Sequence, residues 1–316
     1  MKNQNKLGTI VICILITAFL FSTMEVALKL AGGGMDPLQL TFLRFFIGGL
    51  VLLPFGIREQ RHNSAVKKRA AKERRLLGLL EARDIPWVLL VGIMCIPVSM
   101  LCFQLGVERC NAATAAAIMS LNPLITMVIA HFFTEEKLTP LKRVAFVMGI
   151  IAGVFLIRPW DVQEGNTVLG MLLMVVAAST FSLYTMLGKQ SIAKVGTFTQ
   201  ISTSFIMGSL VLLVVIIITG RPIVSGVWSH LPLVLYLGIF VTGIAYLCLN
   251  IAVKLSDAAT GSISFFIKPA MAPVFAVLIL RETILGTTII GIIFLIVASV
   301  LTLLDTKRPE IIYKKG

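Results

Sequence analysis

Long apolar segments alternate with short polar ones along almost the whole chain. A helix needs roughly 20 apolar residues to cross the hydrocarbon core of a bilayer. At that length the pattern predicts ten membrane-spanning helices, which fall near residues 7–30, 37–57, 85–106, 111–133, 140–157, 166–188, 197–219, 231–253, 258–280 and 284–304. The fifth has the shortest uncharged stretch, and Lys142 and Arg143 at its start must extend their charged ends toward the membrane surface.

The apolar segments lack the alternating pattern of a membrane β-barrel, so the spans are predicted to be helices. Composition agrees, because 57% of the 316 residues are hydrophobic, only 14% are charged, and the mean hydropathy is +0.96. The predicted fold class is an all-α membrane protein. The first apolar run follows Lys2 and Lys6 as a signal peptide would, but it is long and no small-residue cleavage site follows it, so we expect it to be retained.

The chain repeats itself at an offset of 146 residues, which aligns the third to fifth spans with the eighth to tenth. The matched pairs include Gly92 with Gly238, Cys102 with Cys248, Gln104 with Asn250, Asn122-Pro123 with Lys268-Pro269, and Glu136 with Glu282. Near the first, second, sixth and seventh spans the offset is 160, which pairs Phe21 with Phe181, Phe45 with Phe205, and Gly48 with Gly208. The difference lies between the second and third spans, where a basic insertion covers residues 58–83.

Each repeat unit holds five spans, an odd number, so the second copy enters the membrane from the opposite side. We therefore predict two inverted five-helix repeats, residues 1–160 and 161–316. Inverted repeats allow two related halves to exchange conformations around a central site, which is the architecture of alternating access.

Basic residues separate by loop. With the N-terminus inside, 21 of the 28 lysines and arginines fall in cytoplasmic segments and five on the other side. The positive-inside rule thus predicts a multi-pass protein of the inner or plasma membrane with both termini cytoplasmic. The insertion at 58–83 is favoured as a solvated loop that sets this orientation, over a basic helix lying on anionic lipid. The net charge of +13 follows topology, so no nucleic-acid partner is expected.

Five cysteines lie in or next to apolar runs without CxxC spacing, so neither a disulfide framework nor a metal site is expected. No phosphate-binding glycine loop is present. We expect no cofactor, and transport driven by gradients rather than directly by ATP.

The segment TEEKLTP at residues 134–140, followed by Gly149 and Gly153, has a weaker copy in RETILG at 281–286. Small-residue runs, NAAT at 111–114 and DAAT at 257–260, open the fourth and ninth spans. With the doubled ten-helix pattern, these segments resemble the EamA family of the drug/metabolite transporter superfamily, from about Gly8 to Leu304. The resemblance implies a ten-helix basket with a central substrate cavity, usually in exporters of amino acids and related metabolites. The insertion at 58–83 is longer than the family leads us to expect.

Three ionisable residues lie well inside spans, and an ionisable group in a membrane is a functional candidate by default. Glu25 and Arg44 could form a structural ion pair, with Lys29 a competing partner for Glu25 four residues along the helix. Alternatively, Glu25 binds a substrate amine or carries a coupling proton. Lys268 either attracts an acidic group of the substrate or pairs with a carboxylate or carbonyl.

Proline can kink a helix and free a carbonyl, and broken helices at matching positions point to a midplane binding site. Pro123 and Pro269 are such a pair, so the candidate site includes Asn122 and Lys268. Gln104 and Asn250 could line the same cavity or form hydrogen bonds between helices. Tyr184, Tyr246, Phe265 and Phe266 could form its walls, although such aromatics are more often lipid-facing or packed.

Glu136 and Glu282 lie at span ends on opposite sides of the membrane, and each is predicted to cap or pair with a helix start in its own half. The motif from Gly149 to Gly153 favours close helix packing, either within the bundle or between protomers, and gives no basis for an oligomer.

The predicted function is secondary-active transport of small metabolites, such as amino acids or related organic compounds, with export favoured by the family resemblance. Coupling to a proton, to another ion or to the substrate gradient is left open by a single glutamate. The alternative is a flippase of lipid-linked or amphiphilic substrates with the same architecture. An intramembrane enzyme is remote, because the chain has no HExxH, no GxSxG and no paired aspartates within spans.

Overall fold

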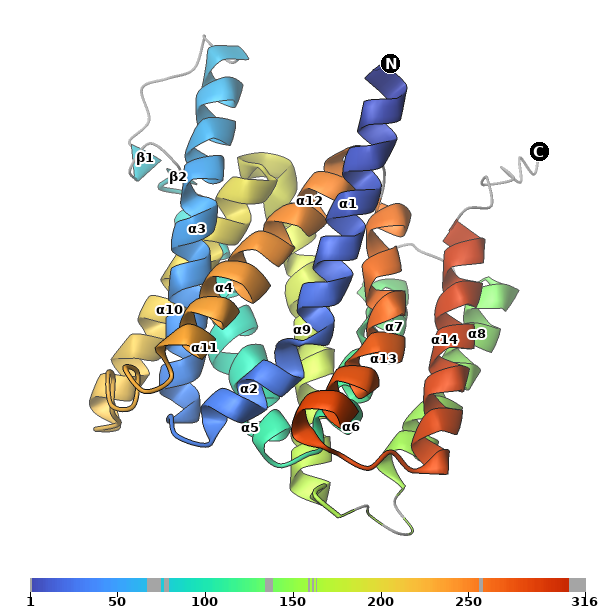
Figure 1. Cartoon of the computed structure of the whole chain (residues 1–316). Helices are drawn as coiled ribbons and strands as arrows, with labels where there is room; N and C mark the ends of the chain where they lie inside the picture. Colours follow the sequence, from blue (N-terminus) through green and yellow to red (C-terminus); the bar gives the residue numbers. More distant parts are fainter. Residues whose placement is uncertain are drawn as a thin grey trace, which may run out of the picture.

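The structure is a computed structural model that describes residues 2–66, 75–76, 80–133, 139–158, 160, 162, 164–255 and 258–306. Its long helices run between two ends of a bundle (Figure 1). In the first part of the chain the elements are α1 Lys2–Ser22, α2 Met24–Gly32, α3 Pro37–Val66, β1 Arg75–Leu76, β2 Leu80–Glu81, α4 Ile85–Ile93, the π-helix η1 Met94–Met100, α5 Leu101–Glu108, α6 Ala112–Met119, α7 Asn122–Phe133 and α8 Pro140–Ile157. The second part comprises α9 Val168–Val195, α10 Thr197–Ile218, α11 Leu231–Leu235, the π-helix η2 Tyr236–Ile244, α12 Ala245–Leu255, α13 Ala258–Leu280 and α14 Gly286–Thr306.

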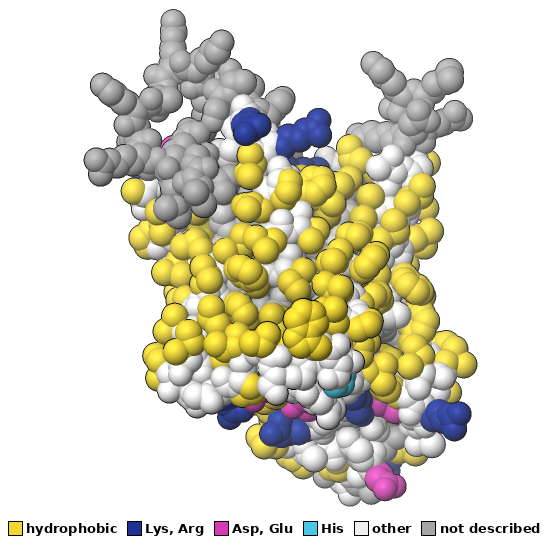
Figure 2. Space-filling model, turned by 60° about the vertical axis from the view of Figure 1, so that its left-hand side comes forward, with side chains coloured by type: hydrophobic (Ala, Val, Ile, Leu, Met, Phe, Trp, Pro, Cys, Tyr) yellow, Lys and Arg dark blue, Asp and Glu magenta, His cyan; other side chains and the backbone are white. Residues whose placement is uncertain are grey.

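Within the described residues, eight helical segments are long and apolar enough to cross a membrane. They are Leu7–Gly32, Pro37–Arg61, Ile85–Glu108, Ala112–Ile129, Pro140–Ile157, Val168–Val195, Thr197–Ile218 and Leu231–Leu255. Shorter apolar stretches, Ile267–Leu280 and Gly286–Thr302, lie at the predicted ninth and tenth spans. The all-helical membrane class is therefore confirmed, whereas the number ten and the inverted arrangement stay predictions. Figure 2 shows hydrophobic side chains over the middle of one face and charged side chains toward its ends.

The basic insertion begins as helix rather than as loop. The second span was predicted to end near residue 57, but α3 continues to Val66. Beyond it, β1 and β2 pair in antiparallel fashion, with Arg75 opposite Glu81. Residues 67–74 and 77–79 lie outside the described part of the chain.

Several spans are not regular helices. The first bends at Thr23, between α1 and α2, and the fourth is interrupted at Ser120 and Leu121, between α6 and α7. Pro123 lies in the first turn of α7, whereas Pro269 lies inside the continuous helix α13. The π-helices η1 and η2 overlap when the chain is aligned on itself at the 146-residue offset. The third and eighth predicted spans therefore depart from α-helical geometry at corresponding places.

Two helix crossings rely on glycine. At the crossing of α4 and α10, a Cβ on Gly92 would lie 2.4 Å from the Ser204 carbonyl oxygen, and one on Gly208 would lie 2.3 Å from the Gly92 carbonyl oxygen. At the crossing of α3 and η2, a Cβ on Gly48 would lie 3.2 Å from the Gly238 carbonyl oxygen. The sequence repeat pairs Gly92 with Gly238 and Gly48 with Gly208, so both crossings use matched positions.

Helices α8 and α14 pack against each other at one side of the bundle (Figure 1). The small-residue motif predicted in α8 packs against another helix of the same chain, because a Cβ on Gly149 would lie 2.4 Å from Leu124 Cδ1 of α7. On α14, a Cβ on Gly291 would lie 3.1 Å from the Ala152 carbonyl oxygen. These contacts account for the glycines by packing inside the bundle.

A carboxylate from the second half of the chain caps a helix of the first half. Glu282 Oε1 accepts hydrogen bonds from Lys29 Nζ at 2.9 Å and the Ala112 backbone amide at 2.7 Å, and Oε2 accepts one from the Ala113 amide at 3.2 Å. Glu282 therefore caps a helix start, as predicted, but the prediction that the helix lies in its own half is wrong. The positive N-terminus of α6 and the Lys29 ammonium both attract this carboxylate. Glu136 lies outside the described residues.

Glu59 caps the N-terminus of α10 in the same way. Its Oε2 accepts hydrogen bonds from the backbone amides of Phe198 at 2.8 Å and Thr199 at 3.1 Å, and its Oε1 pairs with Lys254. In the sequence, nothing distinguishes Glu59 from the other charged residues of the insertion at 58–83, so this contact was not predicted. The start of α1 and the end of α14 lie at the same end of the bundle (Figure 1), as the predicted topology requires; that this end is cytoplasmic stays a prediction.

Candidate functional site

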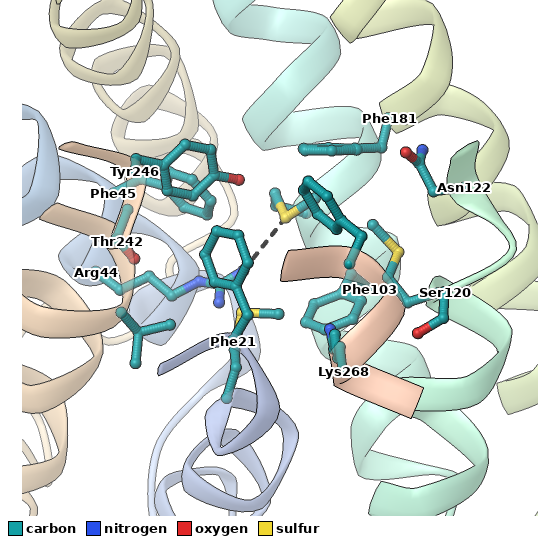
Figure 3. A pocket seen from close by; sticks show the side chains of 15 residues that line it. Phe21, Arg44, Phe45, Phe103, Ser120, Asn122, Phe181, Thr242, Tyr246 and Lys268 are labelled. Atoms are coloured by element: carbon teal, nitrogen blue, oxygen red, sulfur yellow. Dashed lines mark hydrogen bonds between the residues drawn. The ribbon is translucent and has the colours of Figure 1, made fainter. Parts of the chain in front are cut away.

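A cavity lies between the helices of the bundle (Figure 3). The space there that no protein atom fills, including any part open to solvent, is about 540 Å³. Its lining residues are Phe21, Met24, Arg44, Phe45, Met100, Phe103, Met119, Ser120, Asn122, Phe181, Val241, Thr242, Tyr246, Phe265 and Lys268. Most of these side chains are aromatic or carry a thioether. Both parts of the chain contribute, since α1, α2, α3, η1, α5, α6 and α7 meet α9, η2, α12 and α13 around it.

Many lining residues occupy matched positions of the sequence repeat. The pairs are Phe21 with Phe181, Met100 with Tyr246, Met119 with Phe265, and Asn122 with Lys268. Two predicted site residues, Asn122 and Lys268, thus face one cavity. The match also shows how the two halves differ, because an amide in one half corresponds to an ammonium in the other.

Lys268 and Glu25 form a buried ion pair. Lys268 Nζ lies 2.6 Å from Glu25 Oε1, and the two side chains are only 5% and 1% exposed. Glu25 is in the first turn of α2, directly after the bend at Thr23, and Lys268 is in α13, which packs against α1 and α2. The sequence suggested Arg44 or Lys29 as the partner of Glu25, and both suggestions are wrong, because Glu25 pairs with Lys268.

Lys29 instead reaches the end of the bundle, where it contacts Glu282 and donates a hydrogen bond to the Cys110 carbonyl oxygen at 2.8 Å. Glu25 and Lys29 are both in α2, but Lys29 has an acceptor on another span. The packing of α13 thus decides a pairing that helical spacing alone left ambiguous.

Arg44 is a buried cation in the cavity wall, 1% exposed. Its guanidinium carbon lies 4.6 Å from the centre of the Phe45 ring and 5.7 Å from that of Phe103, and Nη2 donates to Met100 Sδ at 3.4 Å. Among the described residues, no carboxylate lies within 4.0 Å of it and its Nε has no hydrogen-bond partner. Ring faces attract a cation but offset only part of the loss of water.

The wall opposite Arg44 is neutral (Figure 3). There Asn122 Nδ2 donates to the Ala178 carbonyl oxygen at 3.0 Å and to Ser182 Oγ at 2.8 Å, so α7 is fixed to α9. Ser120 lies beside it at the break between α6 and α7. Asn122 and Ser120 thus lie on the side of the cavity away from Arg44, and Lys268 lies between Arg44 and Ser120 (Figure 3).

Three other predicted site residues are not among the lining side chains. Gln104 Nε2 donates to Glu108 Oε1 at 3.2 Å, and Asn250 Nδ2 donates to the Tyr246 carbonyl oxygen at 2.7 Å within its own helix. Tyr184 is buried beside Phe181, with ring centres 5.2 Å apart. Tyr246 does line the cavity, and its ring contacts Phe21 at 5.4 Å and Phe205 at 5.2 Å.

Sequence reasoning missed most of the apolar lining, including Phe21, Phe103 and Met100. An apolar side chain in an apolar span carries no signal of its own. The repeat offsets could have found the matched pairs once Lys268 and Asn122 were placed at the site. Phe266, also considered as a wall residue, has a side chain outside the described part.

No group of three or more metal-ligating side chains occurs in the part of the chain that the structure covers.

The family model described as "EamA-like transporter family" matches the chain twice, at residues 8–158 and 168–304. An uncharacterized transporter of Clostridium kluyveri is 35% identical over 306 residues, covering 95% of this chain and 94% of the relative. An S-adenosylmethionine uptake transporter of Rickettsia bellii is 22% identical and covers 91% and 90% of the two chains. A solved crystal structure matches with a TM-score of 0.64 at 20% identity, over 96% of this chain and 99% of the other, which shows a shared fold.

Proposed function

Because the chain belongs to the EamA-like transporter family, we propose that it is a secondary-active exporter of small metabolites, such as amino acids or related organic compounds, that works by alternating access around the central cavity. The observation that carries this proposal is the cavity itself, with the guanidinium of Arg44 in its wall, which has no carboxylate partner among the described residues. A buried cation without a carboxylate is costly in a protein interior, and a bound acidic group would supply the missing partner.

The lining of the cavity supports a small organic substrate. Ligand sites usually have mostly apolar walls and a few polar groups that set orientation. Here the rings and methionines would contact the carbon skeleton. Arg44 and Lys268 would hold the acidic group.

The repeat supports alternating access. Four pairs of matched residues line the cavity, and matched glycines make the two close crossings. Related halves built in this way can exchange conformations, so that the site opens first to one side and then to the other. The Glu282 cluster at one end of the bundle and the Glu59 cluster at the other join separate helices, and each would have to loosen when its end opens.

Glu25 is the candidate for ion coupling. It lies behind Lys268, beside the bend between α1 and α2, so a change in its charge would act on Lys268 directly. A proton on Glu25 would release Lys268 to the substrate. Export, rather than the uptake stated in the name of the Rickettsia relative, is the direction we propose.

Counterflow into liposomes that contain the purified protein tests this function. Vesicles are loaded with single compounds from a panel of amino acids, organic acids, S-adenosylmethionine and a lipid-linked sugar, and exchange of the labelled compound is measured. We expect exchange of at least one water-soluble metabolite, its loss in Lys268→Ala, and its retention in Arg143→Gln, a change at the exposed start of α8. Lys268→Met combined with Glu25→Leu provides a variant in which neither member of this ion pair is left as a single buried charge.

Exchange of the lipid-linked sugar alone would favour a flippase and contradict the proposal. Full exchange by a folded Lys268→Ala protein would show that Lys268 is not part of the substrate site. Direction is tested in inverted membrane vesicles, where an exporter accumulates its substrate inside.

A further inference from the structure

The charges that face the cavity are all of one sign. Arg44 and Lys268 line it, and no described acidic side chain does. Glu25 lies behind Lys268 and neutralises it, so that pair contributes no net charge. The guanidinium of Arg44 is left over, so the charges of the described residues at the site sum to +1.

Arg44 is also the better placed of the two cations to bind a ligand. Lys268 is held at 2.6 Å by Glu25, whereas Arg44 has only the Met100 sulfur as a side-chain hydrogen-bond acceptor among the described residues. A guanidinium presents its N–H groups as a planar fork that matches a carboxylate, with two parallel hydrogen bonds. A carboxylate at Arg44 would satisfy donors that the protein leaves unused.

The rest of the described lining offers an ammonium group no carboxylate. Apart from Arg44 and Lys268, its polar members are the Asn122 amide and the hydroxyl-bearing Ser120, Thr242 and Tyr246, all of them uncharged. The other lining side chains are mostly rings and thioethers, which suit an apolar or aromatic body. An ammonium in this setting would be buried without a carboxylate, which is unfavourable.

We propose that the site selects monoanions: compounds with one carboxylate or similar compact acidic group, which binds Arg44, and an apolar or aromatic body, which packs on the rings. Zwitterions and cations of the same size are selected against. This inference rests on the proposed function and narrows its substrate class from metabolites in general to those with a net negative charge.

The test compares three compounds that share a phenyl ring on a three-carbon chain and differ in charge: 3-phenylpropionate, phenylalanine and 3-phenylpropylamine. Binding isotherms are recorded with the purified full chain in detergent at neutral pH. We expect 3-phenylpropionate to bind at least tenfold more tightly than phenylalanine, and 3-phenylpropylamine to bind most weakly.

Arg44→Gln should weaken binding of 3-phenylpropionate at least tenfold and abolish the preference for the anion. Arg44→Lys should keep part of it, because the charge remains and the fork is lost. Arg143→Gln should bind as the unmodified protein does. Since no described carboxylate pairs with Arg44, Arg44→Gln should not lower the melting temperature. A marked fall would assign Arg44 a structural role instead and overturn the inference.

Phenylalanine binding as tightly as 3-phenylpropionate would overturn the inference and would mean that Glu25 leaves Lys268 to receive the ammonium. Tighter binding of the amine would overturn it as well. So would the absence of binding by all three compounds. In each case the counterflow panel still decides separately whether the protein transports metabolites.

Discussion

Arg44, Glu25 and Lys268 are all buried, but their surroundings give them different roles. Glu25 and Lys268 form an ion pair at 2.6 Å, whereas Arg44 faces two rings and a sulfur atom. A buried ion pair contributes little net stability, because the loss of water offsets the attraction, but removing one member leaves a charge exposed to the apolar interior. The pair and the single cation should therefore respond differently to substitution.

Glu25→Gln should destabilise the protein, because Lys268 then remains as an uncompensated buried cation, at a cost of about 3–5 kcal/mol. Glu25→Leu combined with Lys268→Met should recover most of that loss, since neither charge of the pair is left. The measurement is thermal unfolding in detergent, with Arg143→Gln as the control for loss of a charge at an exposed position.

Transport separates structure from function in the same variants. We expect the double variant to fold but not to transport, because Lys268 is part of the binding wall. Full transport by the double variant would show that the pair only holds α2 to α13. Equal melting temperatures for Glu25→Gln and the unmodified protein would contradict the buried pair itself.

At the scale of single residues, polarity was the predictive signal. Lys268, Asn122, Arg44 and Tyr246 were identified as candidates from sequence, and all four line the cavity. The partner of Glu25 was harder to predict, because the sequence suggested Arg44 or Lys29 and the pairing with Lys268 depends on how α13 packs. Rings such as Phe103 look the same in a sequence whether they face lipid, core or cavity.

At the scale of elements, the bend at Thr23 shows what hydropathy misses. The pattern predicted one helix over 7–30, without a proline or glycine at the bend. The hydroxyls of Ser22 and Thr23 donate to the Ala18 and Leu20 carbonyl oxygens, and such bonds to the preceding turn bend helices. The Thr23 hydroxyl also lies 2.5 Å from that of Tyr236, so the bend is fixed to the start of η2.

Gly92→Ala should destabilise the crossing of α4 and α10. The new Cβ would lie 2.4 Å from a backbone oxygen, which cannot rotate away as a side chain can, and overpacking of this kind costs about 1–3 kcal/mol. Gly8→Ala is the matched control, since nothing lies within 4 Å of its added Cβ. Melting temperatures in detergent that fall equally for both, or for neither, would disagree with the close approach.

Glu282→Gln should loosen the junction between α6 and the loop before α14. The substitution removes the negative charge that accepts from Lys29 and from two amides of α6, and a hydrogen bond to a charged group is worth about 1.5–3 kcal/mol. The expected result is a lower melting temperature, whereas Glu164→Gln, in an exposed loop, should leave it unchanged. An unaltered Glu282→Gln protein would show that the cap contributes nothing.

For the whole molecule, hydropathy was enough to predict a helical membrane protein, because lipid leaves the backbone few alternatives. The repeat added the matched positions that line the cavity. The reach of Glu282 across the two halves was not predictable, since a sequence repeat describes each half separately and says nothing of contacts between them.

The arrangement of the charges predicts where the ends of the chain lie. A fluorescent protein fused to either terminus should fold and fluoresce, as it does in the cytoplasm, because the basic residues gather on that side. Alkaline phosphatase inserted between α10 and α11, at residues 219–230, should be active, as it is in the periplasm. Alkaline phosphatase is also fused to each terminus. Activity at both termini would show that the orientation is the reverse of the predicted one, and activity at one terminus only would contradict an even number of crossings.

The unmatched charge of Arg44 has an electrical consequence. If the substrate is a monoanion that crosses alone, each cycle carries one negative charge, worth about 2.3 kcal/mol per 100 mV of membrane potential. In a cell that is negative inside, this drives the anion outward to a ratio of roughly fiftyfold, since about 1.4 kcal/mol is a factor of ten. Liposomes made positive inside by a potassium gradient and valinomycin should then accumulate 3-phenylpropionate, and protein-free vesicles should not. Voltage would set the direction of such a carrier without any accompanying ion.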